Sequence, residues 1–81
     1  MHEGIVELDL HGFNSYQARV AIDAALRRSR GVYRLRLIHG YHSGNTLSEM
    51  IAAEYGGHPR VKKLQPGKNP GITELVLKEW F

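Results

Sequence analysis

Cysteine is absent from this sequence of 81 residues, and no long hydrophobic run is present. Without cysteine the chain has no disulfides, no thiolate zinc site and no cysteine nucleophile, so any metal would need His, Asp or Glu ligands. No apolar stretch approaches the roughly 20 residues of a membrane span, and the first residues lack the pattern of a secretory signal. We therefore expect a soluble, cytoplasmic protein with no membrane partner. A chain of this length has room for one hydrophobic core, which predicts a single domain over residues 1–81.

Positive charge is in modest excess, +3 in total, but it is clustered along the chain. Two stretches contain most of the basic residues and no acidic residue: Arg27, Arg28, Arg30, Arg34 and Arg36 in the first, and Arg60, Lys62, Lys63 and Lys68 in the second. Such clustering favours a phosphate backbone, in DNA or RNA, as the partner. Solvated faces that keep a small domain soluble are an equally weighted explanation of the same charges.

Hydrophobic periodicity divides the chain into six elements. Residues 5–10 and 33–38 alternate between apolar and polar side chains, as half-buried strands do. Each is followed by a helical stripe of apolar residues, with capping-box spacing at Asn14 and Gln17 in the first helix and at Thr46 and Glu49 in the second. Glycines at 31 and 56 end the helices. Residues 60–65 and 72–78 predict two further strands joined by a turn rich in proline and glycine.

This order predicts a two-layer α/β sandwich with the sequence β-α-β-α-β-β. Three strands linked by helices should run parallel, and the closing hairpin should add an antiparallel strand to give a four-stranded mixed sheet. Since each helix has one apolar stripe, both helices should lie on one face of the sheet. The other face should carry charged side chains that form cross-strand ion pairs, namely Glu7, Arg34, Arg36 and Glu74.

The first two predicted strands both run into a His-Gly dipeptide, at His11-Gly12 and at His39-Gly40. In an open parallel sheet, ligands bind at the carboxyl ends of the strands, so we expect the two turns to meet at one edge as a working site. Taken one at a time, these residues are better explained by structural roles such as permitting a turn or binding a backbone amide. Their repetition at equivalent positions favours a shared site.

The chemistry of the two turns suits a phosphodiester. Glycines here and at Gly44 let the backbone approach a ligand, and the amides that open the following helix can accept a phosphate. The turns hold three histidines, His11, His39 and His42, beside the carboxylate of Asp9, and imidazole exchanges protons near neutral pH. Strict alternation, however, puts Asp9 on the open face and His39 on the side of the buried leucines, so the strand ends must twist for the two to meet.

The run Leu8-Asp9-Leu10-His11-Gly12, with Ile38-His39-Gly40 and Gly44 further on, resembles the Smr family, the small MutS-related domain. The turn Asn69-Pro70-Gly71 resembles the family's turn before its last strand. One departure is His42, where the family usually has a glycine. The resemblance implies a fold like the C-terminal domain of translation initiation factor three, and an endonuclease that nicks DNA or cleaves RNA. It links Asp9 and His11 to cleavage, His39 and Gly40 to nucleic-acid contact and activity, and Gly12 and Gly44 to the turns.

Two principal hypotheses follow. In the first the protein is an endonuclease in which Asp9 activates water or holds a divalent cation such as Mg²⁺ or Mn²⁺, while His11 or His39 transfers protons. In the second it is a non-catalytic module that grips DNA or RNA with the same edge. The residues predicted to contact nucleic acid are Gly12, Arg34, Arg36, Gly40, Tyr41, His42, Gly44, Lys62 and Lys63. Tyr41 could stack on a base. A protein-interaction domain that uses the charged sheet face is a third reading.

Overall fold

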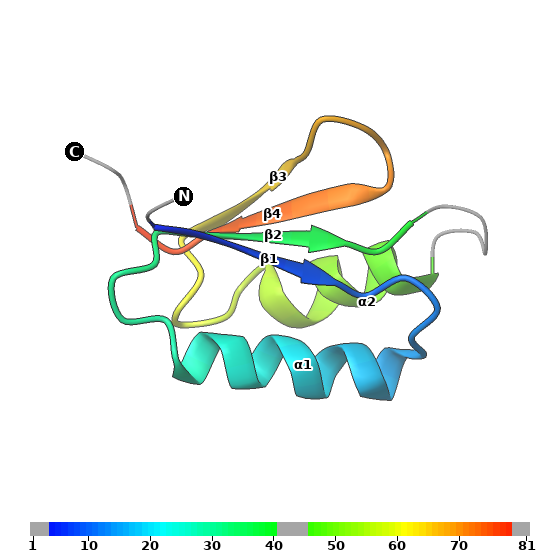
Figure 1. The fold of residues 1–81 in the computed structure, drawn as a ribbon, viewed down its shortest axis with the longest axis horizontal. Coiled ribbons are helices and arrows are strands. Elements are labelled where there is room, and N and C mark those ends of the chain that lie inside the picture. The colour runs from blue at the N-terminus through cyan, green and yellow to red at the C-terminus, as the bar shows by residue number, and fades with distance from the viewer. Residues whose placement is uncertain (1–3, 41–45, 79–81) are drawn as a thin grey trace.

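The structure, a computed structural model, describes residues 4–40 and 46–78. Two helices cover one face of a four-stranded sheet and leave the other face open (Figure 1). The elements in chain order are β1 (Ile5–Asp9), α1 (Ser15–Arg27), β2 (Arg34–Ile38), α2 (Thr46–Tyr55), β3 (Lys63–Pro66) and β4 (Ile72–Val76). The predicted two-layer sandwich and its β-α-β-α-β-β order are confirmed. No helix in these described ranges is long and apolar enough to cross a bilayer.

The sheet has the order β1-β2-β4-β3, so the last strand of the chain lies inside the sheet. β1 pairs parallel with β2, and β4 pairs antiparallel with both of its neighbours, β2 and β3. β1, β2 and β3 therefore point the same way, as predicted, although β4 separates β2 from β3. Because β1 and β2 are parallel neighbours, their carboxyl ends lie at the same edge of the sheet.

β3 begins later than the sequence predicts, at Lys63 rather than at residue 60. The cause is a local turn, in which the Val61 amide donates to the His58 carbonyl at 3.0 Å and the Arg60 amide donates to Nδ1 of the His58 ring at 3.0 Å. Backbone groups that close a turn are not available for a strand ladder. The predicted strand over residues 60–65 is therefore wrong in its first three residues.

The first helix begins where its capping box predicts. The Asn14 side chain accepts from the Gln17 amide at 2.8 Å, and the Gln17 side chain accepts from the Asn14 amide at 2.9 Å. This reciprocal pair satisfies two of the amides that a helix start leaves free. The predicted cap of the second helix, Thr46, is instead the first residue of α2, so the position before that helix falls outside the described residues.

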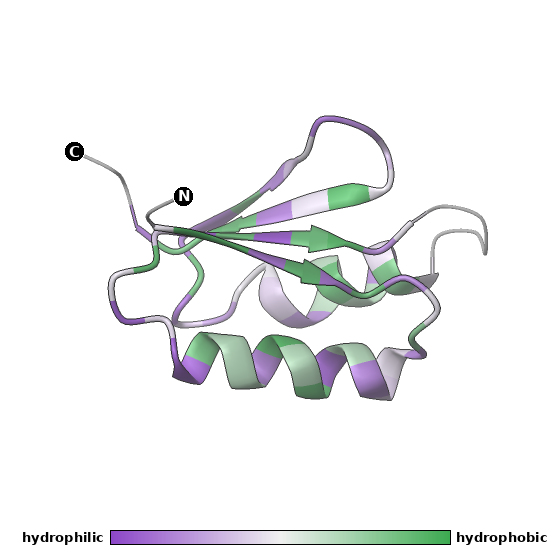
Figure 2. Ribbon diagram, in the orientation of Figure 1, coloured by the Kyte–Doolittle hydropathy of each residue, from purple (hydrophilic) through white to green (hydrophobic). Residues whose placement is uncertain are grey.

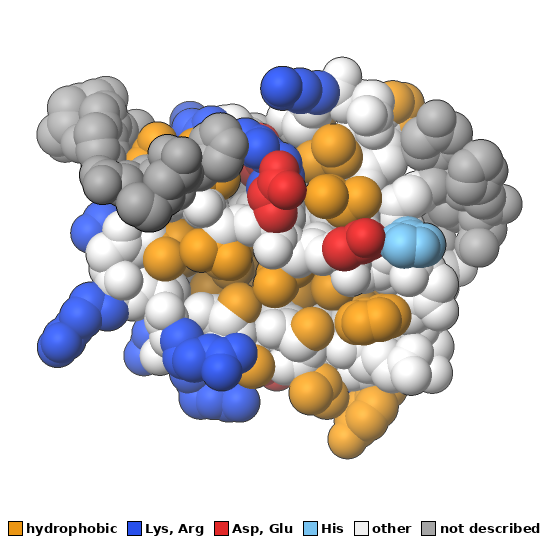
Figure 3. Space-filling model, in the orientation of Figure 1, with side chains coloured by type: hydrophobic (Ala, Val, Ile, Leu, Met, Phe, Trp, Pro, Cys, Tyr) orange, Lys and Arg blue, Asp and Glu red, His pale blue; other side chains and the backbone are white. Residues whose placement is uncertain are grey.

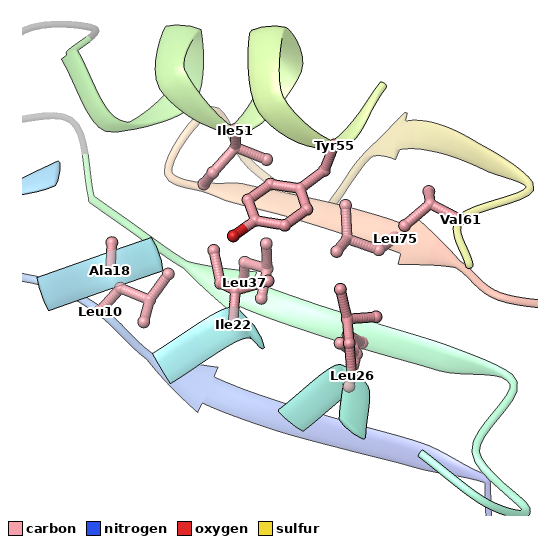
Figure 4. Close-up of a cluster of buried hydrophobic side chains, with 10 residues drawn as sticks. Leu10, Ala18, Ile22, Leu26, Leu37, Ile51, Tyr55, Val61 and Leu75 are labelled. Atoms are coloured by element: carbon pink, nitrogen blue, oxygen red, sulfur yellow. The ribbon is translucent and has the colours of Figure 1, made fainter. Parts of the chain in front are cut away.

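The core fills the space between the helices and the covered face of the sheet. Figure 4 shows side chains from both helices meeting side chains from β2 and β4, and Figure 2 shows the apolar residues that recur along these elements. Its largest fully buried members are Leu10, Ile22, Leu35, Leu37, Ile51 and Leu75. Tyr55 belongs to the same cluster, and its hydroxyl donates to Asp23 of α1 at 2.7 Å, which ties the two helices together.

A row of charged and polar side chains crosses the open face of the sheet. The strand register aligns Glu7, Arg36, Glu74 and Gln65, one from each strand. Arg36 donates from Nε to Glu74 and from Nη1 to Glu7, both at 2.9 Å. Arg34 adds an ion pair to Glu74 at 3.3 Å, and Gln65 donates to Glu74 at 3.0 Å. The predicted cross-strand ion pairs are confirmed.

Glu74 is the centre of this row and is only 5% exposed. Burial alone would raise the pKa of its carboxyl group, but the hydrogen bonds from Arg36 and Gln65 and the two guanidinium charges outweigh burial, so the pKa lies below its ordinary value. Hydrogen bonds to Glu74 and Glu7 likewise raise the pKa of Arg36. The charged form of each group is therefore the form that the fold stabilises.

We expect Glu74→Gln to lower the free energy of unfolding by about 1–3 kcal/mol, because Arg36 and Arg34 lose a largely buried charged partner. Urea unfolding at neutral pH measures this loss. The pKa of Glu74 is lowered on folding, so its contribution is present above the ordinary carboxyl pKa of 4.5 and is lost as the pH falls through the folded value. The gap between wild type and Glu74→Gln should therefore narrow in acid.

Glu7→Gln is the matched control, because Glu7 contacts the same guanidinium from the solvent-exposed end of the row. An exposed pair of this kind contributes about 0.2–1 kcal/mol. If Glu74→Gln and Glu7→Gln lower the free energy of unfolding equally, the burial of Glu74 does not determine how much it contributes to stability.

Candidate functional site

The two His-Gly turns lie side by side at the carboxyl edge of the sheet. The Leu10 amide donates to the Ile38 carbonyl at 2.8 Å, so the pairing of β1 with β2 continues past the end of β1. A Cβ built on Gly40 would lie 3.8 Å from the Cβ of His11. Gly12 and Gly40 have φ angles of +81° and +75°, in the left-handed region that favours glycine. The glycine of each dipeptide is thus required by its turn.

A third turn joins this edge through backbone contacts. The amides of His39 and Gly40 both donate to the carbonyl oxygen of Gly71, at 2.9 and 3.0 Å. Gly71 belongs to the Asn69-Pro70-Gly71 turn, in which the Asn69 side chain accepts from the Gly71 amide at 2.8 Å. The second His-Gly turn is therefore fixed from both sides, by β1 and by the turn before β4.

Asp9 and His11 form an exposed acid–histidine pair. Oδ1 of Asp9 lies 2.5 Å from Nδ1 of His11 and 3.3 Å from the His11 backbone nitrogen, which donates to it. The two side chains remain 59% and 75% exposed. Figure 3 shows an acidic side chain beside a histidine at one end of the face that it draws. Because the carboxylate accepts from Nδ1, the imidazole presents Nε2 to solvent.

The contact changes the pKa of both groups. The side-chain hydrogen bond from His11 is the main cause that lowers the pKa of Asp9, and the same bond, assisted by the carboxylate charge, raises the pKa of His11 above 6.5. Asp9 therefore stays ionised, and the imidazolium form of His11 persists to a higher pH than in a free histidine. The pair therefore presents an exposed imidazolium that can donate a proton.

His39 has a different environment from His11. Its side chain continues the inward alternation of Leu35 and Leu37, and the residue is only 7% exposed. Nδ1 donates to the Gly40 carbonyl at 2.8 Å, and Nε2 lies 2.9 Å from the Thr73 hydroxyl. Within the described residues no hydrogen bond joins His39 to Asp9 or His11. The strand ends do not twist in the way that would bring Asp9, His11 and His39 together. His39 keeps the inward alternation that the sequence predicts for it.

The other predicted contact residues are distributed over the molecule. Arg34 and Arg36 lie in the ion-pair row of the open face. Lys62 and Lys63 are exposed at the start of β3, and the register places Lys63 in the row of Ile5, at the end of the sheet away from the turns. Tyr41, His42 and Gly44 fall outside the described residues.

Metal ligands are sparse around the turns. The described ranges contain no group of three or more Asp, Glu or His side chains able to hold a metal ion together. Asp9 offers one carboxylate, which would hold Mg²⁺ only with water or substrate phosphates as the remaining ligands.

Two features of this edge escape sequence analysis. Thr73 is the partner of His39 because β4 packs beside β2, and that placement has no local signal in the sequence. Phe13 directly follows the first His-Gly turn and Tyr16 lies in the first turn of α1, and they are 39% and 68% exposed. In the sequence, both residues lie outside the apolar stripe of α1, and this position indicates that their rings are exposed.

The electrostatic coupling of Asp9 to His11 is open to direct measurement. In an NMR titration we expect the His11 ring to titrate above 6.5 in the wild-type protein and closer to 6.5 in Asp9→Asn, because the amide lacks the charge that favours imidazolium. Glu7→Gln removes a carboxylate two residues earlier on β1 and should leave the His11 midpoint unchanged. A midpoint that does not respond to Asp9→Asn would mean that the pair does not form in solution.

Comparisons with known proteins agree with this architecture. A family model for the Smr domain matches residues 8–72. Among solved structures, the Smr domain of Thermus thermophilus MutS2 superposes with a TM-score of 0.80 at 28% sequence identity, over 91% of this chain and 99% of that one. A search of curated proteins gives no match. Since the family model covers most of the chain, including both His-Gly turns, the protein belongs to the Smr domain family.

Proposed function

We propose that this Smr domain binds nucleic acid and cleaves its phosphodiester bonds at the edge where the two His-Gly turns meet. Smr domains generally bind nucleic acids, and family members have nuclease activity. The observation that carries the proposal is the exposed Asp9–His11 pair, in which a carboxylate holds an imidazole with Nε2 free toward solvent. This arrangement supplies a proton donor where a phosphodiester can reach it.

In the proposed reaction His11 is the general acid. A hydroxyl, from water or from the substrate's own ribose, attacks phosphorus and gives up its proton to solvent water, while the bond from phosphorus to the leaving oxygen breaks. The proton on Nε2 of His11 passes to that leaving oxygen, and the imidazolium charge before transfer offsets the negative charge that develops on the phosphoryl group. Asp9 accepts from Nδ1, which holds the ring in position and keeps it protonated.

His39 has a positioning role in this proposal. Nδ1 of its ring donates to the Gly40 carbonyl, and Nε2 is occupied by Thr73, so neither nitrogen is offered to a substrate. These two bonds tie the second turn to β4 and thereby hold Gly40 beside His11. His39 acts through the shape of the turn rather than by transferring a proton.

In this proposal a divalent cation has one site, at Asp9. Mg²⁺ or Mn²⁺ would be held by Asp9 together with water and the phosphates of the substrate, and would supply charge neutralisation there. Chelation of divalent ions during a cleavage assay tests whether cleavage requires the cation, independently of His11.

Binding without cleavage is the second candidate, and the openness of the pair favours it. With Asp9 and His11 both more than half exposed, nothing in the described ranges covers the pair and excludes water. In this form of the site, the His11 imidazolium pairs with a phosphate oxygen without giving up its proton. Such a module would show salt-dependent binding and no cleavage product with or without divalent ions.

The proposed general acid makes a testable prediction about cleavage. We expect His11→Gln to slow cleavage of a labelled single-stranded RNA, or nicking of a supercoiled plasmid, by about 10²–10⁴-fold. The wild-type rate should fall as the pH rises through the raised pKa of His11, because the acid form is lost there. Asp9→Asn should move this fall to lower pH as well as reduce the rate, since the carboxylate no longer favours imidazolium.

Glu7→Gln provides the control, because Glu7 is exposed on the same strand but is not part of the pair. Its rate and pH profile should match those of the wild type. If His11→Gln and Asp9→Asn cut as fast as the wild type, the cleavage comes from another enzyme in the preparation. If no variant cuts while all bind, the domain is a binding module.

A further inference from the structure

The large hydrophobic side chains that remain exposed are gathered on one side of the molecule. Across the described ranges they are Val6, Phe13, Tyr16 and Val20, at 37, 39, 68 and 51% exposure. All four come from β1, from α1 or from the loop that joins them. Figure 3 shows hydrophobic side chains collected over these two elements. Exposed apolar residues on a soluble domain are ordinarily scattered, and a gathered set marks a contact surface.

This surface begins at the Asp9–His11 pair and follows the outer face of α1. Phe13 lies two residues after His11, in the loop before the helix. Tyr16, Val20 and Arg27 then recur at intervals of four and seven residues, which places them on one face of α1. α1 is 13 residues long, so this face extends for about 20 Å. We call the face formed by Phe13, Tyr16 and Val20 the aromatic strip.

The far end of the aromatic strip is strongly basic. A depression of about 540 Å³ lies there, and its described lining includes four cationic side chains, Arg27, Arg30, Arg60 and Lys78, and no acidic one. Arg60 is held in place because its Nη1 donates to the Leu26 carbonyl at the end of α1, at 3.0 Å. The other three form no ion pair with any described residue. Figure 3 shows basic side chains grouped at this end of α1.

We propose that the aromatic strip and the basic depression form a binding track for single-stranded nucleic acid. Bases stack on Phe13 and Tyr16 next to the Asp9–His11 pair, and the phosphate backbone reaches the cations around Arg27 and Arg30. The inference rests on the proposed function, since it names the form of nucleic acid that the same edge receives. It adds a stacking site and a phosphate site at opposite ends of α1.

The chemistry of the surface distinguishes a single strand from a duplex. In a duplex the faces of the bases are already stacked on one another, so exposed aromatic rings gain nothing from it, and cations alone are sufficient to bind it. A single strand offers base faces that stack on tyrosine and phenylalanine. Exposed rings next to cations that have no ion-pair partner among the described residues therefore fit a single strand. Of these cations, only Arg60 has a structural role, since it donates to the Leu26 carbonyl at the end of α1.

The test compares binding of a labelled single-stranded oligonucleotide of about 12 nucleotides with binding of the duplex of the same sequence, by fluorescence anisotropy. Gel electrophoresis checks that the probes stay intact. We expect Tyr16→Ala to weaken single-strand binding by about tenfold and to leave duplex binding unchanged. Tyr16→Phe keeps the ring and should bind like the wild type. Alanine is a good helix former, so the exposed Tyr16→Ala site should remain folded.

The phosphate end has a separate readout, the dependence of affinity on salt. Arg30→Gln should reduce the slope of log affinity against log salt for the single strand by about 0.7, the value for one phosphate contact. Lys68→Gln removes an exposed cation in the turn between β3 and β4 and should leave the slope unchanged. Tyr16→Ala should lower the affinity without changing the slope, because stacking releases no counterions.

The outcomes separate this inference from the proposed function. If the wild-type protein binds neither probe at low salt, the proposed function fails. If it binds both probes and Tyr16→Ala weakens neither or weakens both alike, nucleic-acid binding stands and the stacking track is overturned. If the wild type dimerises by analytical ultracentrifugation and Tyr16→Ala makes it monomeric, the strip is a self-association surface and the track is likewise overturned.

Discussion

The parallel pairing of β1 with β2 is the constraint on which the site depends. Their register ends with Asp9 opposite Ile38, and the bond from the Leu10 amide to the Ile38 carbonyl carries the pairing one residue further. Because β1 and β2 are parallel and end side by side, the turns that follow them lie at the same edge of the sheet. A slip of one residue would exchange the two faces of β1 and turn Asp9 toward the core. The hydrophobic pattern of β1 therefore also fixes the position of the acid–histidine pair.

The same dipeptide has different roles in the two turns, and the strand alternation explains the difference. His39 directly follows β2 and keeps its inward alternation, so its ring is buried and bonded to Thr73. His11 comes two residues after β1 ends, with Leu10 taking the inward position, so its ring stays in solvent beside Asp9. The repeated dipeptide thus gives one exposed and one buried imidazole, and the edge is asymmetric although its motif is repeated.

Sequence analysis recovers what local patterns determine. Periodicity gives the six elements, the Asn14 and Gln17 spacing gives the start of α1, and alternation gives the ion pairs of the open face. The position of β4 between β2 and β3 has no local signal, so Thr73 could not be identified as a partner. The start of β3 was misplaced because a turn at His58 competes with a strand for the same backbone groups. Apart from this local turn, the features that the sequence does not predict are set by contacts between distant segments, such as the packing of β4 beside β2.

The pairing of charges changes how the basic composition relates to binding. Arg34 and Arg36 are matched by Glu7 and Glu74, so the row on the open face contributes no net charge to the total of +3. The clusters of basic residues in the sequence therefore overstate the positive charge that the open face can offer a phosphate. They also do not show that the open face and the C-terminal end of α1 differ in net charge. There four cations line a depression, and none of the described residues that line it is acidic. The positive field that attracts a polyanion should therefore be stronger at the C-terminal end of α1 than over the ion-paired row of the open face.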